Sequence, residues 1–178
     1  MLEVFITDLQ AYNEGNLVGR WFTLPVSEEK LSQVISDVLR EGEEACDTED
    51  HEEYFITDFE WQDHVLFEVG EYSNLSQMNE QLQQLEDKTD HELKAIAFLL
   101  SESLATDIDD AIAKADDVRI YENQSMEDIA YDLIQDCYNI HELSPIIANH
   151  IDYQGIGRDL EMDGNYFEVG NDIYEYAG

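Results

Sequence analysis

Apolar and polar positions in the first third of the chain predict three strands and one helix. Segments 2–7, 17–24 and 53–61 are rich in β-branched and aromatic residues, as half-buried strands are. Ser27 is a predicted N-cap, and the apolar spacing after it (i, i+3, i+4, i+7, i+8) predicts a helix that ends at Gly42. The apolar residues of this helix are Leu31, Val34, Ile35, Val38 and Leu39.

The middle of the chain is predicted to be helical. The preceding residues, 43–53, are rich in acids and have no apolar period, which indicates a solvated loop. Residues 74–85 place their leucines and Met on one side of a helix. Thr89 and Glu92 form the pattern of a capping box before a second helix, and Asp107 is the predicted N-cap of a third.

The last third of the chain contains both the apolar spacing of helices and the alternation typical of strands. Residues 118–121 indicate a short strand, and residues 125–139 indicate a helix capped by Ser125. Pro145 interrupts the pattern before a further short helix, and segments 151–157 and 166–169 resemble strands. The residues predicted to point inward from the 125–139 helix are Ile129, Leu133 and Cys137.

These elements predict an α+β protein built from three small modules in a row. The predicted modules are a β-rich N-terminal one with a single helix (1–61), a helical central one (62–103) and a mixed α/β C-terminal one (104–178). The chain has no low-complexity linker and no internal repeat.

Charge narrows the range of partners. The chain has 43 acidic and 8 basic residues, for a formal net charge of −35. Because phosphate binding needs clustered Lys and Arg, this balance argues against direct binding of nucleic acid and of anionic membranes. The apolar fraction of 43% and the aromatic fraction of 11% are those of a folded protein, and the acids are spread over all three predicted modules rather than collected in a tail.

Targeting signals and cysteine patterns are weak. No apolar run approaches the ~18 residues that span a bilayer. The first residues include Glu3 and Asp8 and lack the basic segment of a secretory signal. Cys46 and Cys137 are too few for a disulfide framework or a Cys-based zinc site. The sequence therefore predicts a cytoplasmic protein with reduced thiols.

Motifs of catalysis and cofactor binding are missing from the sequence. The five histidines form no HExxH pair, and no nucleophile elbow, P-loop or dinucleotide-binding glycine motif occurs. With 43 carboxylates, acids lie close in sequence by chance, so they do not indicate glycosidase chemistry. We expect a protein that is not an enzyme, binds no cofactor and has no metal site.

A calcium-binding module is an alternative prediction. Asp159, Glu161, Asp163 and Gly164 match the opening of an EF-hand loop, whose twelfth position should be a bidentate Glu. That position is Gly170, and the residues before it resemble a strand rather than a helix. The MDGN sequence around Gly164 fits a hairpin turn more simply.

The arrangement of acids suggests a substitute for DNA. Asp128, Asp132 and Asp136 recur every four residues on one predicted helix, where like charges cost roughly 0.2–0.5 kcal/mol a pair. At the duplex density of one charge per ~1.7 Å, the net charge matches about 60 Å of DNA. A compact domain of this length has a radius of gyration of only ~16 Å, so the match predicts an elongated molecule.

The net charge is also compatible with salt adaptation and with a chaperone function. Salt adaptation produces acidic surfaces but specifies no partner. An acidic chaperone or sequestering protein for basic DNA-binding proteins would use the same attraction, often through a disordered acidic tail. A DNA mimic instead needs acids spread over a rigid fold, which this sequence favours.

Three segments resemble the ArdA family of antirestriction proteins. Residues 11–21 (AYNEGNLVGRW) are similar to the family's opening signature, AYNxGxLxGRW. Residues 56–60 (ITDFE) resemble its acidic and aromatic strand, and residues 151–160 (IDYQGIGRDL) match its IDYxxxGRDL block. The resemblance implies a DNA mimic, carried by mobile genetic elements, that occupies the DNA-binding groove of type I restriction-modification enzymes. It also implies three α/β modules, an elongated homodimer and no catalytic residues.

The binding surface is expected to be a distributed set of acids rather than the signature residues. Trp21 and Tyr153 are expected to be packed, and Arg20 and Arg158 to anchor internal ion pairs. The acids predicted to bind the enzyme are Asp109, Asp110, Asp116, Asp117, Asp128, Asp132 and Asp136.

Overall fold

The computed structural model describes residues 1–178, apart from the side chain of His141. The chain folds into two compact units, Met1–Ala97 and Phe98–Gly178, which we call the N-terminal and C-terminal units. Helices and antiparallel sheets occur together, so the predicted α+β class is confirmed.

The N-terminal unit is built on a three-stranded antiparallel sheet in the order β2-β1-β3. Its strands are β1 (Leu2–Asp8), β2 (Gly19–Leu24) and β3 (Tyr54–Trp61). Its helices are α1 (Leu9–Asn13), α2 (Glu28–Cys46), α3 (Leu75–Gln83) and α4 (Asp90–Ser101), the last of which crosses the boundary between the units.

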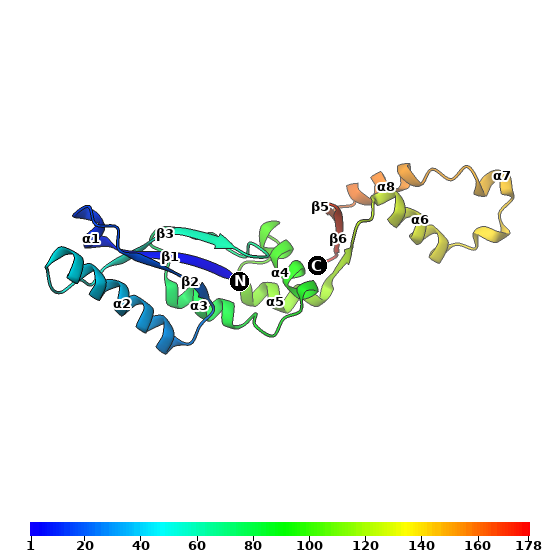
Figure 1. Ribbon diagram of the computed structural model, residues 1–178. Coiled ribbons are helices and arrows are strands. Elements are labelled where there is room, and N and C mark those ends of the chain that lie inside the picture. The colour runs from blue at the N-terminus through cyan, green and yellow to red at the C-terminus, as the bar shows by residue number, and fades with distance from the viewer. The chain divides into compact units, whose positions relative to one another are not determined.

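The core of this unit lies between the sheet and α2, which runs along one side of the strands (Figure 1). Leu2, Val4 and Ile6 alternate along β1 and are fully buried, since alternate residues of a strand share one face. The stripe of α2 meets them with Leu31, Val34 and Val38, as its spacing predicts. The predicted strands and the start of α2 at Ser27 are confirmed.

The end predicted for α2 is wrong. The helix continues through Gly42 to Cys46, so the first residues of the predicted acidic loop are helical. A Cβ at position 42 would collide with the carboxylate of Asp8, so this glycine permits a close approach between helix and sheet. The residue that caps the C-terminal end of the helix is Asp47, whose φ of 54° is left-handed.

The C-terminal unit contains a second antiparallel sheet, in the order β4-β6-β5. Its strands are β4 (Val118–Tyr121), β5 (Tyr166–Val169) and β6 (Asp172–Tyr176). Its α-helices are α5 (Ile108–Lys114), α6 (Met126–Cys137), α7 (Pro145–Ala148) and α8 (Tyr153–Met162). Its short 3₁₀ helices are η1 (Ala115–Asp117) and η2 (Ile140–Glu142).

Aromatic packing holds the sheet of this unit. The ring of Phe98 stacks on Tyr174 with centroids 4.6 Å apart and meets Phe167 edge to face at 5.2 Å. The predicted N-caps at Asp107 and Ser125 accept hydrogen bonds from the first turns of α5 and α6, respectively. The capping box of Thr89 and Glu92 is also confirmed, at the start of α4.

Several predictions for this unit are wrong. The predicted strand at 151–157 is wrong, because α8 begins at Tyr153 and Asp152 caps it by accepting from the Gly155 N–H at 2.9 Å. The turn around Gly164 therefore joins α8 to β5, and the hairpin lies between β5 and β6. Ile129 of α6 is buried as predicted, but Leu133 and Cys137 are exposed, and the other buried residue of the helix is Ala130.

Candidate functional site

The seven predicted acids all lie in the C-terminal unit, in two neighbouring stretches of sequence. The first stretch comprises α5 and η1, and the second is α6. Six of the acids are exposed, and Asp110 is half-buried. On α5 and η1 they are Asp109, Asp110, Asp116 and Asp117, and on α6 they are Asp128, Asp132 and Asp136.

Asp110 has a structural role. Lys114 donates to its Oδ2 at 2.8 Å, and the Thr106 N–H donates to the same oxygen at 3.0 Å. These bonds lower the pKa of Asp110, with the Lys114 ammonium the largest cause. Because Lys114 also donates to the Leu104 carbonyl at 2.9 Å, this acid helps to fasten α5 to the preceding loop and is partly neutralised.

Asp128 is the second acid with a structural role. It completes a capping box with Ser125, whose hydroxyl and N–H both donate to Asp128 Oδ2, at 2.6 and 2.9 Å. These bonds lower the pKa of Asp128, so its charge stabilises the start of α6. The pattern SxxD shows this role only when the helix start is known.

The other acids of α6 are directed at solvent. Asp132 and Asp136 form no hydrogen bond or ion pair with any other described residue. They follow Asp128 at one-turn intervals, about 6 Å apart along the axis. On another side of α6, a Cβ at Gly157 of α8 would lie 2.6 Å from the Met126 carbonyl, so the two helices pack closely. The helix therefore presents a row of carboxylates on a supported scaffold.

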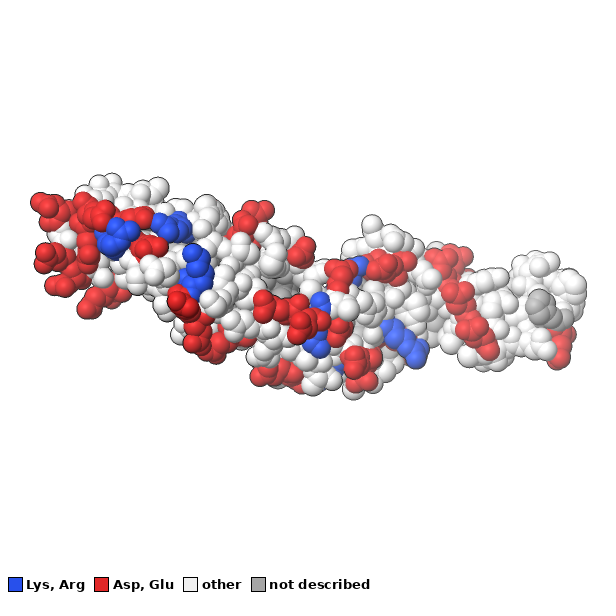
Figure 2. Space-filling model, turned by 60° about the horizontal axis from the view of Figure 1, so that its bottom comes forward, with Lys and Arg blue, Asp and Glu red and all other residues white. Residues whose placement is uncertain are grey.

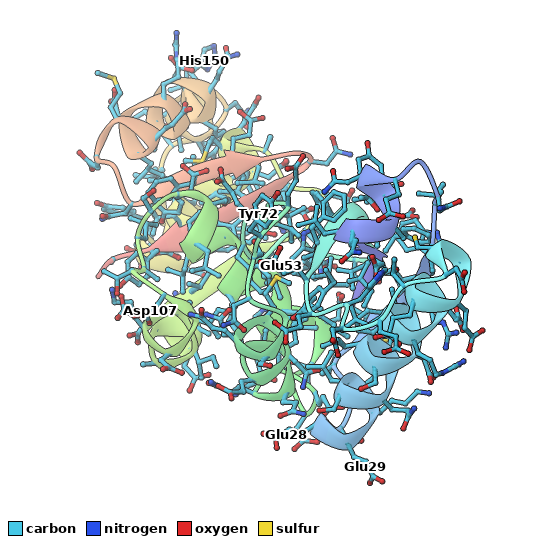
Figure 3. All side chains as sticks on the ribbon, turned by 90° about the vertical axis from the view of Figure 1, so that its left-hand side faces the viewer. Glu28, Glu29, Glu53, Tyr72, Asp107 and His150 are labelled. Carbon is cyan, nitrogen blue, oxygen red and sulfur yellow. The ribbon has the colours of Figure 1, made fainter. Side chains whose placement is uncertain are left out.

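Acidic side chains also cover the N-terminal unit, as the red patches of Figure 2 show for one face. At the start of α2, Glu28 and Glu29 project outward (Figure 3). A surface hollow between α1 and the segment before β3 is lined by further acids. These are Glu14, Asp50, Glu52 and Glu53.

Most of the positive charge is engaged in internal ion pairs. Arg20 contacts Asp37 at 3.4 Å and Glu41 at 2.5 Å, which confirms its predicted anchoring role. Arg158 is exposed and pairs with no described carboxylate, so that prediction is wrong. Six of the eight Lys and Arg residues form ion pairs: Arg20, Arg40, Lys88, Lys94, Lys114 and Arg119.

A fully buried carboxylate–imidazole pair makes a structural interaction. The Nδ1 of His51 lies 2.7 Å from Asp8 Oδ2, and its Nε2 lies 2.7 Å from the Thr48 hydroxyl. The other oxygen of Asp8 accepts from the Ala11 N–H at 2.6 Å and caps α1. Neither side chain of the pair is accessible to a substrate. The pair therefore ties the junction of β1 and α1 to the segment between α2 and β3.

Metal ligands do not converge anywhere among the described side chains. Asp159 and Glu161, which resembled the start of a calcium loop, lie in α8, whose backbone is helical.

None of the helices that the structure describes is long and apolar enough to cross a membrane.

Two aromatic residues of the matched sequence signatures differ in environment. Trp21 is 46% exposed and touches Phe5 edge to face, with ring centroids 5.4 Å apart, so the expected packing is only partial. Tyr153 packs against Tyr131 at 5.1 Å. The exposure of Trp21 depends on which face of the sheet it occupies, which the sequence could show only after the strand register was known.

The sequence model of the ArdA antirestriction proteins matches residues 4–175. The chain belongs to the ArdA family. The match covers nearly the whole chain, so both units fall within it. ArdA proteins are antirestriction proteins. A comparison with curated protein sequences found no match.

Proposed function

We propose that this ArdA protein is a DNA mimic that inhibits type I restriction-modification enzymes by occupying their DNA-binding groove. The main support is the row of exposed carboxylates on α6, of which Asp132 and Asp136 pair with no described residue, in a molecule whose cations are mostly engaged in ion pairs. A groove that binds phosphates with Lys and Arg would attract such a surface. Inhibition of this kind needs occupancy of the groove alone, and hence no catalytic residue or cofactor.

We also propose that the protein acts inside the cell and is carried by a mobile genetic element. Restriction enzymes cut DNA inside the cell, so the inhibitor would act in the cytoplasm. A mobile genetic element that carried the protein would gain protection on entering a new host. We also propose that the chain is organised as three modules, with divisions after residues 61 and 103.

The proposed role of α6 is tested by neutralising its two unpaired acids. Asp132→Asn with Asp136→Asn should weaken binding to a type I enzyme and reduce the slope of log affinity against log salt by about one to two, because fewer ions are released. The matched control is Asp132→Glu with Asp136→Glu, which keeps the charge and should retain binding. Equal affinities and slopes for both variants would contradict the role of α6.

We further propose that two copies of the chain associate through residues 138–151, which form the apolar end of the C-terminal unit. Ile146 and Ile147 are 72% and 56% exposed, and an apolar groove lies beside them. Glu142 is the only acid in these 14 residues, and the end carrying α7 is mostly white in Figure 2. Two molecules of charge −35 can approach closely only where carboxylates are scarce. The groove is lined by Ile134, Tyr138, Asn139, Ile140, Glu142, Leu143 and Ile151.

Sedimentation equilibrium tests this association. The parent chain should have twice the monomer mass, and Ile146→Asp should shift it to monomer, because a charge would enter an apolar contact. Leu17→Asp is a control for a similarly exposed residue, 73% accessible, in the N-terminal unit. A parent chain that sediments as a monomer would contradict the dimer, and a dimeric Ile146→Asp variant would place the contact elsewhere.

A further inference from the structure

The face of the N-terminal sheet opposite the core carries an aromatic pair. Phe5 of β1 is directly opposite Trp21 of β2, and cross-strand partners share a face of the sheet. Leu2, Val4 and Ile6 alternate with Phe5 along β1 and fill the core beneath α2, so the aromatic pair lies on the other face. Nearly half of the Trp21 surface is accessible there.

Carboxylates lie on the same face, on β1 and on the β3 side of this aromatic pair. Asp58 of β3 is the partner of Phe5 on the side away from Trp21. Glu3 is two residues before Phe5 on β1 and pairs with Glu60 of β3. Asp58 and Glu60 are exposed, and Glu3 is half-buried. The outer face thus carries an indole on β2 and, across β1, two acids on β3, with Glu3 on β1 between them.

The protein's own nearby cation does not occupy this face. Arg20 precedes Trp21 on β2, so its side chain lies on the opposite side of the sheet. There it forms ion pairs with Asp37 and Glu41 of α2. The acids that share a face with Trp21 are therefore not neutralised by Arg20.

A sheet face with an exposed indole and nearby carboxylates on the adjoining strands has the chemistry to bind guanidinium groups. The planar cation stacks on an aromatic face and donates paired hydrogen bonds to a carboxylate, whereas an ammonium is a more strongly hydrated point charge. Resting on the proposed function, we propose that Trp21, with Glu3, Asp58 and Glu60, binds arginine side chains of the enzyme's DNA-binding groove.

This surface differs in physical character from the acidic row of α6. Its aromatic contribution comes from stacking and desolvation, which depend little on salt, while the carboxylates contribute a salt-dependent part. The N-terminal unit should therefore confer a preference for arginine over lysine. A purely electrostatic mimic would have no such preference.

The first experiment measures binding to a purified type I enzyme over a range of salt concentrations. Trp21→Ala should weaken binding by about tenfold with little change in the salt slope, and Trp21→Phe should recover part of the loss. Asp58→Asn with Glu60→Gln should flatten the slope. Tyr72→Ala is the matched control, because Tyr72 is also a highly exposed aromatic residue of this unit but stacks on Phe55. Thermal unfolding of each variant verifies that it is folded.

The second experiment needs no enzyme. Arginine-rich and lysine-rich peptides of equal length and charge are titrated into the full chain while the indole N–H signal of Trp21 is followed by NMR. The arginine peptide should bind several-fold more tightly and shift that signal, and Trp21→Ala should abolish the preference. Equal binding of the two peptides, or parent-like enzyme affinity of Trp21→Ala, would overturn the arginine surface while leaving DNA mimicry intact. Failure of the parent chain to compete with DNA would instead contradict the proposed function, whatever the peptides show.

Discussion

The sheet of the N-terminal unit and the α6–α8 region of the C-terminal unit use apolar residues in opposite ways. In the first, β1 buries Leu2, Val4 and Ile6 completely beneath α2. In the second, the described residues of 126–162 that are buried are Ile129, Ala130 and Gly157 alone, and other large apolar side chains are exposed. Those with the greatest exposure are Tyr138, Ile146, Ile147 and Met162.

This contrast indicates that the two regions contribute differently to the protein: the first supplies a stable core, and the second exposes apolar surface. The N-terminal sheet has its own core and an internal polar network around Asp8, so its outer face is free for recognition. The helices around α6 have little core of their own, and covering their apolar end would add the missing burial. We therefore expect mutations in the core of the first region to act on stability, and mutations at the apolar end of the second to act on association.

The largest expected effect is on the buried pair of the N-terminal unit. Asp8→Ala removes the acceptor of both His51 and the Ala11 N–H, so it should lower the free energy of unfolding by about 3–5 kcal/mol. Denaturant unfolding measures the change. Asp37→Ala removes a more exposed ion pair with Arg20 and should cost less than about 1 kcal/mol. Equal losses in the two variants would show that the buried network is not special.

A matched pair of isoleucines compares the two regions directly. Ile6→Ala, in the core, should cost about 2–5 kcal/mol because it leaves a cavity. Ile147→Ala, at the apolar end, should change the stability of the monomer by less than about 0.5 kcal/mol and weaken the dimer instead. Denaturant unfolding at low concentration and sedimentation separate the two effects. A large loss of monomer stability in Ile147→Ala would remove the contrast.

Capping of α6 should have a smaller effect. Ser125→Ala removes the hydroxyl that accepts from the Asp128 N–H and donates to the Asp128 carboxylate, at a cost of about 1 kcal/mol. Ser125→Asp keeps a capping acceptor but places a second acid beside Asp128, so it should recover only part of the stability. A Ser125→Ala protein as stable as the parent would show that α6 depends on other contacts.

The smallest expected effect is on the stability of the protein at low pH. The Thr89 N–H, the Thr89 hydroxyl and Lys88 hydrogen-bond Glu92 and lower its pKa from 4.5 to about 2. A lowered pKa in the folded state means that the contribution of Glu92 is complete above pH 4.5 and is lost as the pH falls toward 2. The melting temperature of the parent should exceed that of Glu92→Gln above about pH 5, and the gap should close across this window. A gap independent of pH would contradict the charged capping box.

Local patterns allowed the starts of α2, α4, α5 and α6 to be predicted, because capping depends on neighbouring residues, although the cap of α8 at Asp152 was missed. The ends of elements depended on contacts distant in sequence. Gly42 has the propensity to end a helix, yet it lies inside α2 because only glycine fits against Asp8. Residues 151–157 contain strand-favouring Ile and Tyr, but Gly157 packs on the backbone of α6 within α8.

For the candidate acids, too, some features could be predicted from the sequence and others required the structure. Their abundance and spacing were visible in the sequence, and so was the implied DNA mimicry. Our prediction treated all seven acids alike, although Ser125 three residues before Asp128 and Lys114 four residues after Asp110 are local signals of the bonds that these two acids make. That Asp132 and Asp136 pair with no described residue required the structure. The grouping of Trp21 with Asp58 required the register of three strands.

Competition with DNA for one purified type I enzyme tests the central claim most directly. Labelled duplex bound to the enzyme is titrated with the parent chain at several salt concentrations. DNA mimicry predicts that duplex and protein exclude each other and that the affinity of the protein falls steeply as salt rises. Formation of a ternary complex, in which the protein binds equally well to enzyme already filled with DNA, would contradict it.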